Sequence, residues 1–468
     1  MIEIMMNLQG GAKAPLYEKI YEYIKSEITD GRIPRGERLP STRLLAKNLA
    51  VSRSTVEMAY DQLLAEGYIQ AEPCRGFFVC DIAELYRLRG SSVGETGQVH
   101  RPEKPVCLVD FSPYAIDTRS FPYNVWRKIS RNVLLDDSEE LLMAGDGQGE
   151  YSLRSEIADY LHHARGVNCR PENIVLGAGN EYLEILLTQL LGGNKTVLME
   201  NPGYPQAYHT FRNMGYRVVT VPADEQGLSG GTVRAAAPEL VYMMPSHQFP
   251  TGSVMPLGRR LELLAWAAEQ EERYLIEDDH DSEYRYRGKP IPSLQSVDGL
   301  GKVIYLGTFS KSIAPSLRIS YMVLPPALMD RYVGTMNFYA CTVSAFEQYA
   351  LTEFMHQGYY DRHIHRMKNF YRNKRDKILE VLKASPLYKQ VEILEKGAGN
   401  HFLMRINTDL SDTQLKWAAA GNGIQISCLS EYCESDKDKY AHILIVNYSD
   451  LEEKGFRTAV EVLSQIIS

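Results

Sequence analysis

Short apolar segments of strand length alternate with amphipathic segments of helix length through much of this 468-residue chain. This alternation is typical of a mostly parallel sheet covered by helices. Ligands of such sheets bind at the carboxyl ends of the strands, so we expect functional side chains in the loops that follow them. The predicted strands are residues 173–176, 196–199, 240–243, 274–276 and 303–306, and the predicted helices between them are residues 181–191, 208–214 and 258–270.

The loop after the last of these strands carries a lone lysine, Lys311, among hydroxyl side chains. A lysine attacks a carbonyl only as the neutral amine, so burial or a nearby cation must lower its pKa. Arg318 follows a few residues later and is the expected cation. Thr308, Ser310 and Arg318 together offer donors suited to a phosphate. The segment therefore predicts a nucleophilic lysine beside a phosphate site, although an isolated Ser-Lys pair is usually a solvated loop.

A different pattern occupies residues 15–80, where three helices and two strands are expected. Ser41 and Ser52 are expected to cap two short helices that a tight turn separates. Helices joined so closely are typical of a helix-turn-helix, in which the second helix enters the major groove of DNA. Two strands around Arg75 would add a wing. The first helix is predicted from apolar residues at every fourth position, Leu16, Ile20, Ile24 and Ile28; the later elements are predicted at residues 42–49, 53–66, 68–70 and 76–79.

The side chains expected to contact DNA lie at the helix starts and on the wing. Arg53 is favoured because a capped helix start directs its guanidinium and free N–H groups toward an anionic groove. Ser41 and Ser52 need only be caps. Residues 1–80 hold ten Lys or Arg and ten Asp or Glu, so DNA binding would depend on local pattern, not on bulk charge. The full set is Ser41, Arg43, Ser52, Arg53, Ser54, Thr55 and Arg75.

Composition sets further bounds on the class of protein. Residues 81–108 are rich in Gly, Ser and Pro and predict a flexible tether between two domains. The sequence shows neither a signal segment nor an apolar run that would span a bilayer, so we expect a cytoplasmic protein with no membrane partner. The seven cysteines are scattered without a Cys-x-x-Cys pair, which predicts neither disulfides nor a bound metal.

Two parts of the sequence resemble one family of proteins. Residues 307–319, Gly-Thr-Phe-Ser-Lys-Ser-Ile-Ala-Pro-Ser-Leu-Arg-Ile, resemble the lysine segment that binds pyridoxal 5'-phosphate (PLP) in the class I aminotransferase-like domains of MocR-type GntR transcription regulators. Residues 39–46, 51–56 and 63–68 resemble the GntR-type winged helix-turn-helix. The resemblance implies an α+β winged helix-turn-helix at residues 15–80, a linker at 81–108, and at 109–468 an α/β fold-type I PLP-dependent aminotransferase-like domain for sensing and dimerisation.

The resemblance also implies roles for individual residues. Lys311 would bind PLP as a Schiff base, the internal aldimine. Tyr204 would stack on the pyridine ring, and Asp278 would keep the ring nitrogen protonated. His280 stands where the family usually carries Tyr, and either ring can bond the phenolic oxygen of the cofactor. The phosphate would be held by Gly179, Asn180, Thr308, Ser310 and Arg318.

Three positions depart from the pattern of true aminotransferases. Phe249 stands where those enzymes carry an Asn on the phenolic oxygen, and His247 either replaces part of that contact or makes a structural hydrogen bond. Ile445 stands where an Arg binds the substrate carboxylate. Arg405 either compensates for that Arg or is a surface charge. Without the Arg, ordinary transamination is not expected.

These features leave several functions open. The first is a regulator, not an enzyme, that binds double-stranded operator DNA as a homodimer. Residues 177–183, 337–349 and 358–367 look most like the subgroup that controls vitamin B6 synthesis and has PLP as its effector. The alternatives are a MocR-type regulator that senses an amine or amino acid through an external aldimine, a working aminotransferase with an accessory domain, and a DNA-binding scaffold without a cofactor.

Overall fold

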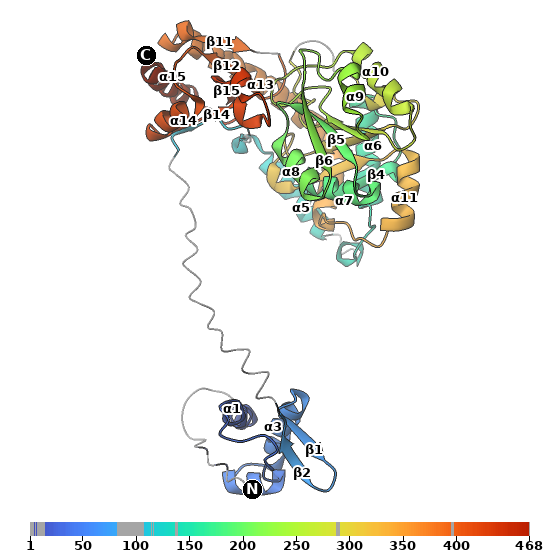
Figure 1. Ribbon diagram of the computed structural model, residues 1–468, viewed down its shortest axis with the longest axis vertical. Coiled ribbons are helices and arrows are strands. Elements are labelled where there is room, and N and C mark those ends of the chain that lie inside the picture. Colours follow the sequence, from blue (N-terminus) through green and yellow to red (C-terminus); the bar gives the residue numbers. More distant parts are fainter. Residues whose placement is uncertain are drawn as a thin grey trace. The chain divides into compact units, whose positions relative to one another are not determined.

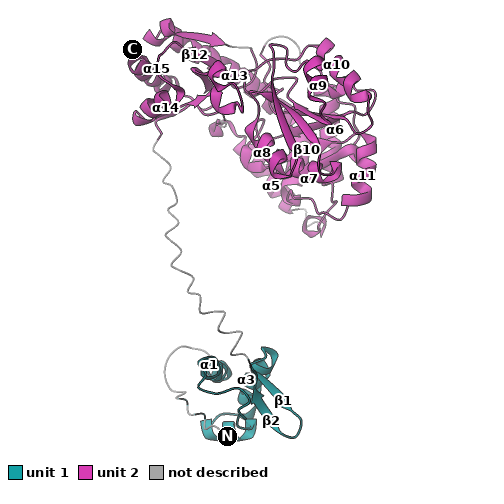
Figure 2. Ribbon diagram, in the orientation of Figure 1, with its two compact units in different colours: residues 1–104 teal, residues 105–468 magenta. Residues whose placement is uncertain are grey.

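The structure is a computed structural model that describes residues 4, 6, 15–81, 107–113, 115, 117–135, 139–286, 291–394 and 397–467. The chain divides into two compact units, residues 1–104 and 105–468 (Figure 2). Most of the expected linker, residues 82–106, lies outside the described part. No helix in the described part is long and apolar enough to cross a membrane.

The smaller unit is the expected winged helix-turn-helix. Ser41 and Ser52 cap α2 and α3 as predicted, because their hydroxyl oxygens accept the N–H groups of Leu44 and Thr55 at 3.2 and 3.1 Å. The predicted start of the first strand is wrong by one residue. The strand begins at Ile69, and Tyr68 packs into the core. The elements are α1 (Leu16–Thr29), α2 (Thr42–Leu49), α3 (Arg53–Ala65) and the antiparallel pair β1 (Ile69–Glu72) and β2 (Gly76–Val79).

One buried tyrosine ties the parts of this unit together. Tyr60 on α3 is fully buried, and its hydroxyl donates to the Pro40 carbonyl oxygen at 2.9 Å. Its ring packs edge-on against Phe77 of β2, with 4.9 Å between ring centroids. Ile20 and Ile24 of α1 complete this core with no exposed surface, and each contributes about 1.5–3 kcal/mol through burial. The entry to α2, the recognition helix α3 and the wing are therefore held by one packed core.

A seven-stranded sheet forms the centre of the larger unit (Figure 1). Its order is β4-β10-β9-β8-β7-β5-β6, and β10 is antiparallel to both of its neighbours. Two of its strands were not predicted from the sequence: β6 (Arg217–Pro222), a half-exposed edge strand, and β10 (Ser320–Val323), which has only four residues. The strands are β4 (Ile174–Gly177), β5 (Thr196–Asn201), β6 (Arg217–Pro222), β7 (Leu240–Met243), β8 (Tyr274–Asp279), β9 (Val303–Thr308) and β10 (Ser320–Val323).

Helices cover both faces of this sheet. Val175 of β4 packs into one apolar core, and its neighbours Ile174 and Leu176 pack into another. Alternate residues of a strand point to opposite faces, so neither face is left to solvent. The helices of this part are α5 (Tyr123–Leu135), α6 (Tyr151–Arg165), α7 (Asn180–Leu191), α8 (Pro205–Asn213), α9 (Gly230–Ala236), α10 (Leu257–Ala268), α11 (Pro326–Met336) and α12 (Ala345–His356).

A second, smaller sheet follows in the chain and has its own core. Its order is β11-β12-β15-β14, and all its pairs are antiparallel. The long helix α13 (Tyr359–Lys383) contributes Tyr360 to a core of the large sheet and Ile378 to the core of the small one. The other elements are β3 (Val109–Asp110), which pairs with β13 (Ile424–Gln425), β11 (Val391–Leu394), β12 (His401–Ile406), β14 (Ser427–Cys428), β15 (Ile443–Asn447), α14 (Asp412–Gly421) and α15 (Glu453–Ile467).

Candidate functional site

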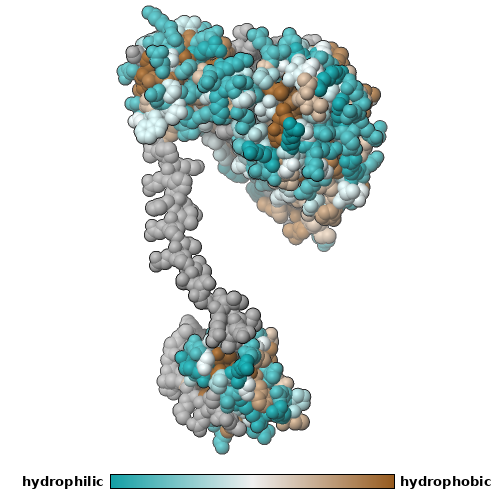
Figure 3. All heavy atoms as spheres, viewed as in Figure 1, coloured by the Kyte–Doolittle hydropathy of each residue, from teal (hydrophilic) through white to brown (hydrophobic). Residues whose placement is uncertain are grey.

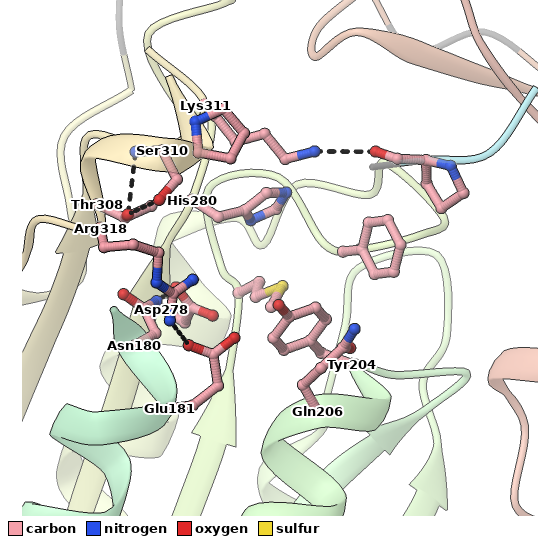
Figure 4. Close-up of a pocket in the computed structure, with 14 residues that line it drawn as sticks. Asn180, Glu181, Tyr204, Gln206, Asp278, His280, Thr308, Ser310, Lys311 and Arg318 are labelled. Carbon is pink, nitrogen blue, oxygen red and sulfur yellow. Dashed lines mark hydrogen bonds and ion pairs between the residues drawn. The ribbon is translucent and has the colours of Figure 1, made fainter. Parts of the chain in front are cut away.

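A pocket of about 210 Å³ lies at the carboxyl ends of β8 and β9, beside the start of α7 (Figure 4). Eight of the side chains predicted from the sequence line it: Asn180, Tyr204, Asp278, His280, Thr308, Ser310, Lys311 and Arg318. Two predicted residues are not among those that line the pocket. Gly179 is the chain neighbour of Asn180, and His247 lies elsewhere. Six further residues complete the wall: Pro113, Glu181, Gln206, Met244, Phe249 and Pro315.

Lys311 reaches across the mouth of this pocket. Its Nζ donates a hydrogen bond to the carbonyl oxygen of Pro113 at 2.9 Å. Figure 4 shows the extended Lys311 side chain with this bond as a dashed line. Burial lowers the pKa of Lys311, and the carboxylate of Asp281 partly opposes that shift. The expected role of Arg318 in lowering this pKa is wrong, because the Arg318 guanidinium turns to Glu181 instead. Burial alone favours the neutral amine.

A cradle of hydrogen-bond donors, which we call the anion cradle, lies beneath Lys311. It consists of Gly179, Asn180, Thr308, Ser310 and Arg318. Gly179 has a φ of 105° and precedes the first turn of α7, so free N–H groups and the positive end of the helix dipole face the pocket. The Thr308 hydroxyl donates to Ser310 Oγ at 3.0 Å and accepts from Ser320 Oγ at 2.9 Å. These bonds fix the two hydroxyls before any ligand arrives.

Asp278 forms the floor of the pocket at the end of β8. It accepts hydrogen bonds from the Tyr242 hydroxyl and from Asn180 Nδ2, the latter at 3.2 Å. Burial raises the pKa of Asp278 to about 6, although His280 and the Tyr242 bond act in the opposite direction. A cationic group placed against Asp278 would stabilise its ionised form and lower its pKa.

Two histidines share the carboxylate of Asp281. His247 is buried, and its Nδ1 lies 2.8 Å from Asp281 Oδ1, while His280 Nε2 lies 3.4 Å from the same oxygen. Burial acts to lower the pKa of His280, but Asp281 and then Asp278 outweigh it and raise that pKa. His247 stacks behind His280, with 6.1 Å between ring centroids. Of the two roles considered for His247, this geometry favours the structural hydrogen bond.

The same three side chains have the spacing of a metal site. The ligand atoms of His247, His280 and Asp281 all lie within 4.8 Å of one another. The carboxylate-imidazole contacts account for that spacing without an ion.

A third histidine, His401, gives a pH-dependent prediction. Burial lowers the pKa of His401 from 6.5 to about 4, and its Nε2 lies 2.9 Å from the Pro250 carbonyl oxygen. Between pH 6.5 and about 4, His401 is protonated in the unfolded chain but stays neutral in the folded one. The free energy of unfolding therefore falls as the pH drops toward 4, by at most about 3 kcal/mol. Below about pH 4 no further loss arises from this group.

Urea unfolding measured between pH 7 and pH 4 checks this expectation. His401→Gln keeps a donor for Pro250 but cannot take up the proton, so its stability should decline less than that of the wild type. His209→Gln, at an exposed position, is the control and should follow the wild type. Parallel curves for His401→Gln and the wild type would contradict the assignment.

Aromatic and apolar side chains form the wall opposite the cradle. Tyr204 lies at the start of α8, and its ring is perpendicular to that of Phe249, with 5.9 Å between centroids. Phe249 also makes edge contacts with His280 and His401. This wall can accommodate the face of a flat ring, and Phe249 offers it no polar atom.

Some lining residues carry no signal in the sequence. Pro113 lies 198 positions before Lys311, in a segment without a motif. Glu181 and Gln206 lie in the first turns of α7 and α8, where polar residues are common. Only their place after a strand of the large sheet could have marked Glu181 and Gln206 as candidates.

The position expected to bind a substrate carboxylate is apolar. Ile445 has no exposed surface, pairs with Leu403 across β12 and β15, and packs with Leu429. Arg405 does not compensate: it is about half exposed, and its Nη1 donates to Glu392 at 3.2 Å. Arg318 is therefore the one arginine among the described residues that line the pocket.

In the smaller unit, the predicted DNA-contacting residues lie on exposed helix starts and on the wing. Arg53 begins α3, and its Nε lies 2.7 Å from Glu57 on the next turn. Arg75 lies in the turn between β1 and β2 and pairs with Glu72. Thr55 is partly buried, and the other predicted residues, Ser41, Arg43, Ser52 and Ser54, are exposed.

Comparison with known proteins agrees with both units. Residues 16–79 match the family model of bacterial regulatory proteins of the gntR family, and residues 111–431 match that of aminotransferase classes I and II. The chain is 39% identical to the uncharacterized HTH-type transcriptional regulator YhdI of Bacillus subtilis, over 99% of this chain and 98% of that protein. It is 32% identical to the probable rhizopine catabolism regulatory protein MocR of Rhizobium meliloti, over 98% and 95%. The chain belongs to the MocR-type GntR family of transcription regulators.

Other members and relatives extend this assignment. The HTH-type pyridoxine biosynthesis transcriptional regulator PdxR of Corynebacterium glutamicum is 32% identical over 88% of each chain. The larger unit resembles the crystal structure of the multiple substrate aminotransferase from Thermococcus profundus, with a TM-score of 0.68 and 25% identity, over 78% of this chain and 92% of that one. The predicted fold-type I aminotransferase domain is thus confirmed.

Proposed function

We propose that this MocR-type regulator binds PLP through an imine bond to Lys311 and senses PLP in order to control vitamin B6 synthesis. One observation carries the proposal. The pocket combines a buried amine, a buried carboxylate and an anion cradle, and its described lining residues include no second guanidinium for the carboxylate of an amino-acid substrate. Because its proposed target is operator DNA, we assign the protein to the cytoplasm.

The residues of the pocket fit PLP. Asn180 Oδ1, an acceptor beside Asp278, is buried and has no hydrogen-bond partner among the described residues. For a phosphate, the cradle offers the backbone N–H groups in the first turn of α7 and the Ser310 hydroxyl. PLP supplies an aldehyde that an amine captures reversibly and a pyridine nitrogen that takes up a proton. Lys311 would hold the aldehyde carbon, and Asp278 would stabilise the protonated nitrogen. Tyr204 would cover the ring face.

His280 would occupy the place of the family's tyrosine at the phenolic oxygen. Its ring lines the pocket between Asp278 and Lys311, and Asp281 holds it from behind. The raised pKa of His280 favours an imidazolium, which donates a hydrogen bond to an anionic oxygen. His247 would orient this ring through the shared carboxylate and would not touch the cofactor.

We infer that transamination is not the function of the larger unit. A carboxylate brought to Ile445 would lose its hydration among Leu403 and Leu429 without gaining an ion pair. An effector that is itself PLP needs no such pair. The similarity to a pyridoxine biosynthesis regulator supports PLP as the effector.

The proposed partners are a second copy of the chain and a double-stranded operator. Exposed apolar side chains on the larger unit, among them Leu142 at 81%, Phe338 at 76% and Met143 at 69% exposure, support self-association there. Figure 3 shows apolar atoms at the lower tip of this unit. A homodimer would present two helix-turn-helix units to two half-sites.

Titration of the cofactor-free protein tests which ligand is the signal. Binding to DNA fragments upstream of its own gene and of vitamin B6 synthesis genes is measured first with PLP alone and then after addition of a primary amine or amino acid. We expect PLP alone to change the affinity for DNA. A change that appears only after the amine is added would replace the vitamin B6 role with amine sensing.

A further inference from the structure

An acidic side chain occupies the anion cradle itself. Arg318 Nη2 lies 2.8 Å from Oε2 of Glu181 and donates to the Ala178 carbonyl oxygen at 3.1 Å. Both Glu181 and Arg318 line the pocket, and Figure 4 shows their side chains meeting beside Asn180. The one pocket arginine that would bind a phosphate is thus already paired with a carboxylate of the same chain.

The backbone directs both side chains to this point. Arg318 has a φ of 52° at the end of the short helix Pro315–Leu317, and Glu181 is the second residue of α7. A Cβ placed on Gly179 would lie 2.1 Å from Arg318 Nη2 and 2.8 Å from Glu181 Oε2. The ion pair therefore lies directly against Gly179, the residue that precedes the first turn of α7.

A phosphate and the Glu181 carboxylate require the same donors. Both are anions that a helix N-terminus and a guanidinium stabilise, and at the short distances of this cradle like charges repel. A bound phosphate would force Glu181 away from Arg318 and then lie near its charge. This repulsion weakens the binding of a ligand's phosphate and does not affect the contacts of its ring or aldehyde.

We propose that Glu181 is a built-in competitor for the phosphate group and sets the affinity of the pocket for phosphorylated ligands. The inference rests on the proposed function in that PLP is the ligand concerned. Competition by Glu181 lowers the affinity for PLP without removing any contact to the ring. PLP occupancy can then rise and fall with the PLP concentration, as a sensor requires. A permanently loaded cofactor would carry no signal.

The expected effect follows from the exposure of the pair. The Glu181 and Arg318 side chains are 41% and 51% exposed, so their ion pair is weak and a dianionic phosphate can displace it. Glu181→Gln removes the charge and keeps the size of the side chain. We expect this variant to bind PLP about tenfold more tightly than the wild type, a change typical of a single partly screened charge.

The test compares two ligands and two variants of the full chain. PLP and pyridoxal differ only in the phosphate, and their affinities are measured from the absorbance of the imine. Glu392→Gln is the matched control, because Glu392 forms a similarly exposed ion pair with Arg405 on the small sheet. Glu181→Gln should bind PLP more tightly and pyridoxal as the wild type does, and Glu392→Gln should change neither affinity.

Other outcomes separate this inference from the proposed function. An unchanged or weaker PLP affinity in Glu181→Gln, or an equal gain for pyridoxal, would overturn the competitor role. If the wild type bound no PLP, the proposed function would fall, and inorganic phosphate would decide the role of Glu181. Phosphate should then raise the melting temperature of Glu181→Gln more than that of the wild type; an equal rise would reject the inference.

Discussion

Replacement of Lys311 by alanine is expected to abolish covalent binding of PLP. The wild type should gain the visible absorbance band of an imine, and borohydride should fix the cofactor to the chain. Lys311→Ala should show neither effect, because no other amine lines the pocket among the described residues. Its affinity for PLP should fall about 100-fold or more, since only the cradle and the ring contacts remain.

The physical reason lies in the position of the amine. Burial lowers the pKa of Lys311, and the Pro113 carbonyl oxygen holds its Nζ over the pocket. Lys389→Ala, at an exposed position, is the matched control and should retain both the band and the fixed adduct. An adduct of undiminished amount in Lys311→Ala, or its loss in Lys389→Ala, would show that another lysine is responsible.

Replacement of Arg53 by alanine is expected to weaken operator binding about 10- to 100-fold, the range for one arginine contact to a base. Arg53 begins the capped helix α3, and its side chain is 59% exposed. Its ion pair with Glu57 holds the guanidinium on the outer face of the helix. On binding, the guanidinium would exchange the Glu57 carboxylate for an acceptor on the DNA. The affinity is measured on operator DNA at several salt concentrations.

Arg32 supplies the control for this experiment. It belongs to the same unit, is 56% exposed and also pairs with acidic residues, Glu27 and Asp30, but it follows α1 and not the turn between α2 and α3. Arg32→Ala should bind the operator nearly as the wild type does. Equal losses for the two variants would indicate a general charge effect and would argue against recognition by α3.

The winged helix-turn-helix was predictable because its signals are local. Ser41 and Ser52 act within three residues of their own position, and the stripe at Ile20 and Ile24 follows the helical period. The wing needed only a turn between two short strands. Each element could be placed without knowledge of the others.

The pocket was predictable in part, for a topological reason. Asp278 lies at the end of β8 and Lys311 follows β9, and adjacent parallel strands bring their carboxyl ends together. The antiparallel β10, a strand of four residues, carries no comparable local signal. The contact of Lys311 with Pro113 and the pairing of Arg318 with Glu181 depend on that tertiary arrangement, so neither could be predicted from the sequence.

The central claim is that PLP at Lys311 controls binding to DNA. It is tested most directly by the affinity of the full chain for its operator with and without PLP, in the wild type and in Lys311→Ala. We predict that PLP changes the affinity of the wild type and leaves that of Lys311→Ala unchanged. An equal response of both proteins, or no response of the wild type to PLP, would contradict the account.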